Sequence, residues 1–84
     1  MKIKLYGAAR CHKTQHYQQY FKGRNLAFDF LDVEESEENA EELRSLYTNR
    51  KLNFPTILLD TKKLRNPSDA ELSKWIDKLK VSKL

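Results

Sequence analysis

The chain has 84 residues, 39% of them hydrophobic, with 2 Gly, 2 Pro and 1 Cys. This length suffices for one domain, residues 1–84, and the composition is globular, unlike that of a linker or a disordered segment. One cysteine excludes an intramolecular disulfide and suits a reducing compartment, so we expect a cytoplasmic protein. We find no signal peptide and no apolar run near the roughly 20 residues of a membrane span, so we expect no membrane partner.

The charges are unevenly distributed along the chain, whose formal net charge is +4 at pH 7. Between Asp29 and Glu42 there are eight acidic residues and no basic one, whereas residues 1–28 hold six basic residues and no acidic one. The acidic run is typical of the solvated face of a helix. No aromatic residues interleave with a basic stripe, so nucleic acid is not an expected partner.

The hydrophobic pattern and the capping signals predict seven elements in chain order. They are a strand at 2–6, a helix at 12–22 ended by Gly23, a strand at 26–31, a helix from Ser36 reaching to about Lys51, a strand at 56–59, a weak strand at 62–64, and a last helix after Ser68. Ser36 precedes two glutamates, which the positive end of a helix dipole favours. Ser68 lies three residues before Glu71, which is a capping box.

The order β-α-β-α-β-(β)-α predicts an α/β fold with a small mixed sheet flanked by helices. A right-handed strand-helix-strand crossover makes the first two strands parallel. We expect a core that includes the side chains of Tyr17, Tyr20, Phe21, Ala40, Leu43, Tyr47 and Trp75. Lys2 and Lys4 do not suit a fully buried central strand, so either their stems lie along an exposed edge or the strand is incompletely covered.

Cys11 lies between the first strand and the first helix. A thiolate there faces unpaired N–H groups and the positive end of the helix dipole, which lower a cysteine pKa. Arg10 and Lys13 add positive charge beside it. The alternative interpretation is a small buried hydrophobic residue. His12 and His16 share a helix face with Cys11, but no fourth ligand is evident, so we interpret them as surface residues and expect no metal site.

Two segments carry a resemblance to a known family. Tyr6-Gly7-Ala8-Ala9-Arg10-Cys11-His12-Lys13-Thr14 resembles the redox loop of glutaredoxins, and Phe54-Pro55-Thr56-Ile57 is similar to their segment with a cis proline facing the cysteine. The resemblance covers residues 2 to 79 and implies a thioredoxin-like, glutaredoxin-type fold. The chain departs from the family at Thr14, where dithiol members have a second cysteine. It also departs at residues 64–69, which replace a Gly-Gly-x-Asp turn.

The resemblance implies a monothiol thiol-disulfide oxidoreductase with glutathione as co-substrate. Its substrates would be glutathionylated proteins or low-molecular-weight disulfides, and we expect a monomer. Cys11 would be the nucleophile. Thr14 lies about one helical turn after Cys11, so either its hydroxyl donates to the thiolate or it is simply a polar residue in the first turn of the helix. The glutathione-binding residues implied are Arg10, Lys13, Phe54, Pro55, Ser68 and Asp69. Two alternatives stay open: a homodimer sharing an iron–sulfur cluster through Cys11, and a redox-inert interaction module with this scaffold.

Overall fold

Strands and helices alternate in the computed structural model, which describes residues 1–81. The elements are β1 (Ile3–Gly7), α1 (His12–Gly23), β2 (Asp29–Asp32), α2 (Glu37–Ser45), β3 (Thr56–Leu59), β4 (Lys62–Arg65) and α3 (Asp69–Val81). This is the predicted order, and it includes the fourth strand, whose sequence signal was the weakest. Ser36 caps α2 by accepting from the Asn39 N–H, as its sequence predicts.

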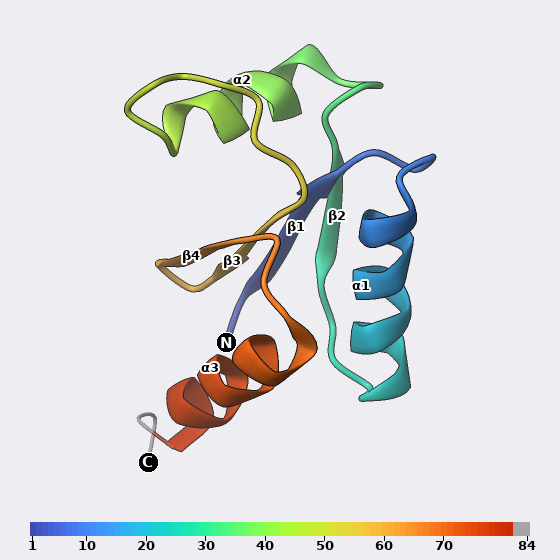
Figure 1. Cartoon of the computed structure of the whole chain (residues 1–84), viewed down its shortest axis with the longest axis vertical. Coiled ribbons are helices and arrows are strands. Elements are labelled where there is room, and N and C mark those ends of the chain that lie inside the picture. The colour runs from blue at the N-terminus through green and yellow to red at the C-terminus, as the bar shows by residue number, and fades with distance from the viewer. Residues whose placement is uncertain (82–84) are drawn as a thin grey trace.

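The four strands form one mixed sheet in the order β2-β1-β3-β4. β1 and β2 are parallel, which confirms the crossover argument, whereas β3 is antiparallel to both β1 and β4. The sheet places β1 in the centre, with β3 beside it (Figure 1). The chain segments that follow β1 and precede β3 therefore meet at one edge of the molecule, because these two strands run in opposite directions.

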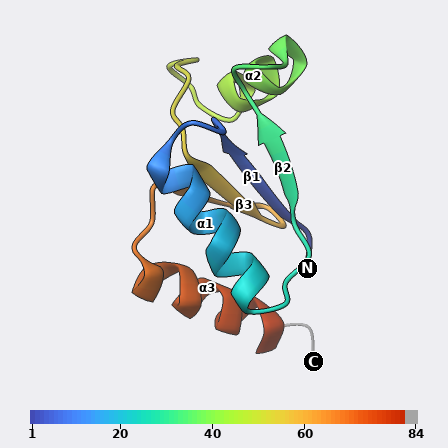
Figure 2. The same ribbon diagram turned by 90° about the vertical axis from the view of Figure 1, so that its right-hand side faces the viewer.

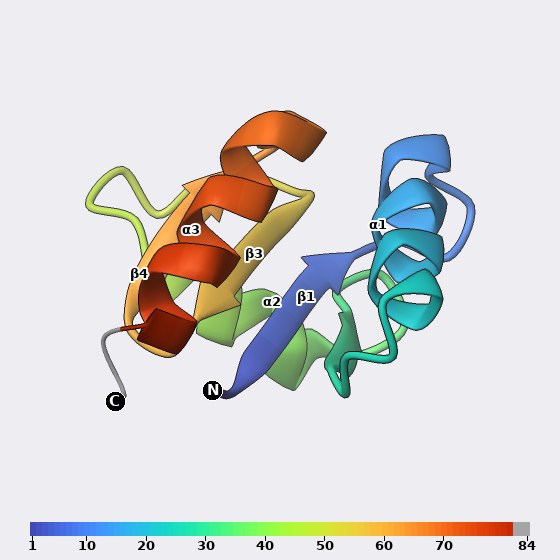
Figure 3. The ribbon, with the colours of Figure 1, turned by 90° about the horizontal axis from the view of Figure 1, so that it is seen from below.

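The two faces of the sheet are covered unequally. α1 and α3 lie on one face and α2 lies on the other (Figure 3). The larger core lies under α1 and α3, and its buried residues are Ile3, Leu5, Tyr17, Phe21, Ile57, Leu59, Leu64, Leu72 and Ile76. The smaller core, under α2, consists of Tyr6, Val33, Ala40 and Leu43. Tyr20 and Trp75 pack against the larger core but are only partly buried.

α2 covers its face of the sheet only at one end (Figure 1), and Lys4 of β1 lies on that face. Lys4 Nζ lies 2.9 Å from Glu42 Oε1, and the Tyr6 hydroxyl donates to the same oxygen at 2.7 Å. Lys2 lies just before the start of β1 and forms an ion pair with Asp29. Incomplete coverage is thus the alternative that holds, and Glu42 partners the one lysine that α2 reaches.

Two helix ends differ from the prediction. α1 does not stop with Gly23 in a left-handed conformation; that role belongs to Asn25, at φ 56°. The Leu26 N–H donates to the Phe21 carbonyl at 2.9 Å and the Asn25 N–H to that of Lys22, which together form a Schellman motif. Residues 24–26 thus belong to the end of the helix, and β2 begins at Asp29 and not at residue 26.

The second helix is shorter than expected. α2 ends at Ser45, so that Tyr47 lies in the following loop, partly buried. Thr48 and Asn49 follow, and such side chains favour turns over helix interiors because they compete for backbone hydrogen bonds. Arg50 has a φ of 53°, which no helix accepts. The loop therefore leads away from the helix and toward β3.

Gly7 is required by the approach of α1 to the end of β1. A Cβ atom at this position would lie 2.3 Å from Thr14 Oγ1 and 2.6 Å from Thr14 Cγ2. Thr14 is fully buried, so its side chain has little room to withdraw. The glycine thus allows the first turn of α1 to pack directly on the strand that precedes it.

Gly7→Ala is expected to destabilise the fold by about 1–3 kcal/mol, the usual cost of overpacking a tight site. Urea unfolding followed by circular dichroism measures the change in the free energy of unfolding. Gly23→Ala is the matched control, because a Cβ there meets nothing within 4 Å. The control should leave stability unchanged or raise it by up to about 1 kcal/mol, since alanine is the better helix former. Equal stability of the two variants would contradict the steric argument.

Candidate active site

Cys11 is the N-cap residue of α1. Its backbone is extended, with φ −81° and ψ 123°, and its carbonyl accepts the first helical hydrogen bond from the Gln15 N–H at 3.0 Å. The Cys11 N–H donates to the Ala8 carbonyl at 2.9 Å, which closes the loop that leads from β1 into α1 (Figure 2). The side chain is partly exposed and makes no capping hydrogen bond. The sulfur atom is thereby held next to the helix start while staying open to a reactant.

Thr14 lies beneath this loop, and its side chain does not reach the molecular surface. Its side chain is fully buried, and Oγ1 accepts a hydrogen bond from the Ala8 N–H at 3.3 Å. A hydroxyl that accepts in this way keeps its proton for donation elsewhere. Thr14 therefore has two functions: it fastens the loop to α1, and it supplies a donor on the cysteine side of the helix.

The surroundings of Cys11 lower the pKa of its thiol below the ordinary value. Partial burial acts in the opposite direction and raises the pKa, but the favourable contributions exceed it. These come from the N–H and hydroxyl of Thr14, from the Lys13 N–H, and from the positive charge of Lys13. Donors and cations near a thiolate favour the charged form, which is the form that attacks disulfides.

A cleft of about 420 Å³ opens beside Cys11. Its lining residues are Cys11, Lys13, Phe54, Pro55, Arg65 and Asn66. The Phe54–Pro55 peptide bond is cis, which confirms the expectation from the sequence. The structure thus brings four of the predicted site residues together, from two segments about forty residues apart. Arg65 and Asn66 are additional lining residues that the sequence reasoning did not select.

Asn66 takes the place of a glycine in the turn before α3. Its φ is 47°, in the left-handed region that asparagine tolerates better than most residues, and its N–H donates to the Pro55 carbonyl at 3.0 Å. The Gly-Gly turn is absent, yet the backbone still bends where a glycine would be expected. The Asn66-Pro67 dipeptide is a turn signal that could have indicated this role.

The segment before β3 is held by a chain of hydroxyl groups. The Thr56 hydroxyl donates to the Asn53 carbonyl at 2.5 Å, and the Tyr47 hydroxyl lies 2.9 Å from Thr56 Oγ1. Because the Thr56 proton is used, Tyr47 is the donor of the second bond. Tyr47, expected in the core, thus supports the Pro55 side of the cleft.

A second cleft, of about 410 Å³, adjoins the first. Its lining is His12, Lys13, His16, Tyr17, Asn66, Pro67 and Ser68, so the two clefts share Lys13 and Asn66. Ser68 Oγ accepts from the Glu71 N–H at 3.1 Å and caps α3. Asp69 lies 2.8 Å from His16 Nε2 and joins α3 to α1. Ser68 and Asp69, which the sequence predicted to bind the far end of glutathione, therefore already have hydrogen-bond or ion-pair partners within the protein.

Arg10 lies outside the lining of both clefts. Its guanidinium makes a bidentate pair with Glu34, with Nη2 at 2.6 Å from Oε2 and Nε at 2.9 Å from Oε1. The pair is exposed, so a ligand carboxylate would have to compete with Glu34 for Arg10. Lys13 forms no ion pair within residues 1–81 and lines the cleft beside the sulfur atom.

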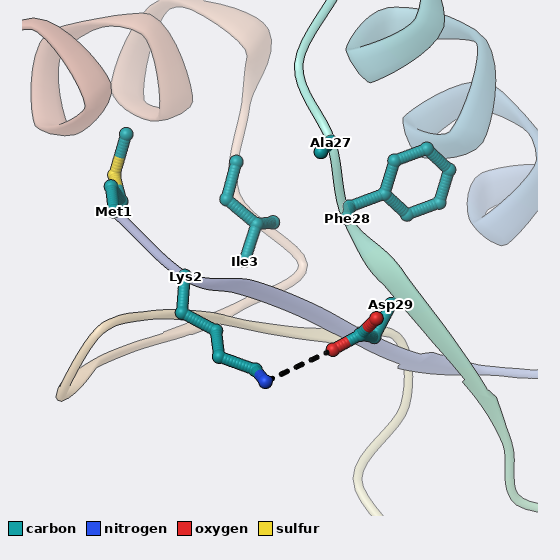
Figure 4. A pocket seen from close by; sticks show the side chains of 6 residues that line it. All are labelled: Met1, Lys2, Ile3, Ala27, Phe28 and Asp29. Carbon is teal, nitrogen blue, oxygen red and sulfur yellow. Dashed lines mark ion pairs between the residues drawn. The ribbon is translucent and has the colours of Figure 1, made fainter.

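Another hollow, within residues 1–81, has no nucleophilic side chain in its lining. This hollow, of about 300 Å³, lies at the opposite end of β1, beside Met1, Ile3 and Phe28 (Figure 4). Its charged groups, Lys2 and Asp29, pair with each other at 3.5 Å. Among residues 1–81, no three His, Cys, Asp or Glu side chains gather to hold a metal ion. No helix in that range has the length and apolar character needed to cross a membrane.

Comparison with known proteins supports the fold. No protein-family model matches the sequence, and no curated protein matches it significantly. The structure of thioredoxin-like protein BC3987 superimposes with a TM-score of 0.73 at 22% identity, over 87% of this chain and 97% of that chain. A point variant of BC3987 gives 0.75 at 21% identity, over 89% and 99%. A glutaredoxin from Archaeoglobus fulgidus gives 0.74 at 16% identity, over 89% and 85%.

The chain therefore has a thioredoxin-like fold. The likeness to the archaeal glutaredoxin, together with the order of strands and helices, agrees with the glutaredoxin-type arrangement expected from the sequence. At these identities the comparisons establish the fold, and the chemistry has to be argued from the cleft itself.

Alkylation of Cys11 by iodoacetamide, followed against pH, is expected to show an inflection below that of free glutathione measured alongside. Thr14→Val and Lys13→Gln should each move the inflection upward, because each removes a group that stabilises the thiolate. Lys22→Gln is the matched charge control, since Lys22 lies near the far end of α1. An inflection of the unmodified protein at or above that of free glutathione would contradict the proposed activation.

Proposed function

We propose that the protein is a glutaredoxin-like monothiol thiol-disulfide oxidoreductase that reduces glutathione mixed disulfides. The observation that carries this proposal is the cleft in which Cys11, with its pKa lowered, faces the cis Phe54–Pro55 segment. A thiolate that is both stabilised and accessible is what thiol-disulfide exchange requires. The likeness in fold to a solved glutaredoxin supports this assignment.

The reaction needs only one protein sulfur atom. The Cys11 thiolate attacks the glutathione sulfur of a mixed disulfide, forming a Cys11–glutathione disulfide, and the substrate leaves as a thiolate that takes up a proton. A second glutathione thiolate then attacks the glutathione sulfur of this adduct. Oxidised glutathione leaves with the two oxidising equivalents, and Cys11 returns to the thiolate. The substrates would be glutathionylated proteins or small disulfides. The protein would act as a monomer, in a reducing compartment such as the cytoplasm.

The cleft offers complementary groups along the length of a tripeptide. Lys13 would meet a glutathione carboxylate beside the sulfur. The Phe54 N–H and C=O have no hydrogen-bond partner within residues 1–81, so they are open to an extended peptide. Ser68 borders the adjoining cleft, and Asp69 could receive the ammonium group of the ligand in exchange for His16. Arg10 would bind a glutathione carboxylate in place of the Glu34 carboxylate.

Oxidised glutathione is expected to convert the protein to a single adduct on Cys11, one glutathionyl group heavier by intact mass. Cys11→Ser should remain unmodified under the same conditions, because the chain has no other thiol. Reduced glutathione should then remove the adduct. If no adduct forms while circular dichroism shows that the protein stays folded, the glutathione assignment is wrong.

Thr14→Cys is expected to lose the adduct by closing a disulfide between Cys11 and the introduced thiol. The two positions are three residues apart at the start of a helix, so their Cα atoms lie within bridging distance. Gln19→Cys is the control, because its position lies about 12 Å along the helix from Cys11 and the adduct should persist. Persistence of the adduct in both variants would show that position 14 does not face the sulfur atom.

A further inference from the structure

The cleft beside Cys11 contains two cations and no carboxylate. Lys13 enters it from the first turn of α1, and Arg65 enters it from the end of β4. Arg65 pairs in register with Thr56, the residue after Pro55, which places it on the proline side of the opening. The two positive side chains thus belong to different elements and reach the cleft from different directions.

Neither cation is neutralised by an acidic group within residues 1–81. Within residues 1–81, Lys13 and Arg65 form no ion pair, although both are exposed. Two acidic residues from neighbouring elements are already paired: Glu34 with Arg10 and Asp69 with His16. Most of the remaining acidic residues belong to the segment 29–42, which comprises β2, the following loop and most of α2. The positive potential of the cleft is therefore left for a reactant.

We infer that Arg65 is a specificity-determining residue that, together with Lys13, makes the cleft select sulfur compounds carrying an anionic group close to the reacting sulfur. This inference rests on the proposed exchange at Cys11 and names the class of its partners: carboxylated thiols and disulfides are preferred over neutral ones, and cationic ones are disfavoured. Arginine suits this function because its planar guanidinium can bind a carboxylate through two parallel hydrogen bonds. Lys13 contributes a point charge nearer to the helix start.

The test compares an anionic and a neutral alkylating reagent on the same thiolate. In both reactions the Cys11 sulfur attacks the methylene carbon and iodide leaves, so the ratio of iodoacetate to iodoacetamide rates cancels the thiolate fraction. Arg65→Gln is expected to lower this ratio by about threefold at roughly 0.1 M salt, the size expected for one nearby surface charge. Lys22→Gln removes an equal charge about 16 Å away along α1, beyond the screening length, and should leave the ratio unchanged.

A disulfide series extends the test to the exchange reaction. Adduct formation on Cys11 is measured by intact mass with dithiodipropionate, which is anionic, bis(2-hydroxyethyl) disulfide, which is neutral, and cystamine, which is cationic. The unmodified protein should react in that order of decreasing rate. Arg65→Gln should reduce the differences in rate between the three disulfides. A rate ratio that Arg65→Gln leaves unchanged, or that Lys22→Gln lowers equally, overturns the inference.

The two proposals fail in different ways. Alkylation requires no disulfide, so an unchanged rate ratio in Arg65→Gln removes the selectivity assigned to this residue even where oxidised glutathione still forms an adduct. A lowered ratio without any glutathione adduct supports the anion selectivity of the cleft, and it refutes glutathione as the partner.

Discussion

The close approach of Gly7 to Thr14 is the contact on which the site depends. The strand can run directly into the first turn of α1 only because position 7 has no side chain, and the Thr14 hydroxyl then fills that space. The same hydroxyl accepts the Ala8 N–H, while the Ala8 carbonyl accepts the N–H of Cys11. One buried side chain thus holds both the loop and the helix start. The position of the sulfur atom is a consequence of packing, and its acidity follows from the donors that this packing gathers around it.

The second half of the site comes from the antiparallel pairing of β1 with β3. Because the two strands run in opposite directions, the end of β1 and the beginning of β3 lie side by side, and Cys11 meets Pro55. The turn after β4 is joined to the same place by the bond from the Asn66 N–H to the Pro55 carbonyl. An asparagine in a left-handed conformation is sufficient for this turn, which therefore needs no glycine.

Charge is distributed unevenly over the surface of the molecule. Acidic residues gather on β2 and α2, where Glu42 also partners the lysine of the half-covered central strand. The cleft contains two cations that form no ion pair within the described residues 1–81, next to a thiol whose pKa is lowered. The net charge of +4 alone does not describe this distribution. A reactive thiolate beside fixed positive charge favours anionic partners at the encounter and during the reaction, and this links the shape of the fold to the kind of disulfide it would reduce.

The sequence by itself determined the features that depend on near neighbours in the chain. Helix caps at Ser36 and Ser68, the parallel pairing of β1 with β2, and the place of Cys11 at a helix start all follow from local patterns and from the handedness of the crossover. Tertiary structure alone decided which distant side chains share the cleft. It placed Arg65 beside Cys11, set Arg10 against Glu34 and closed Asp69 onto His16. The register of β3 with β4 and the packing of α1 against α3 decide such contacts, which a one-dimensional pattern does not encode.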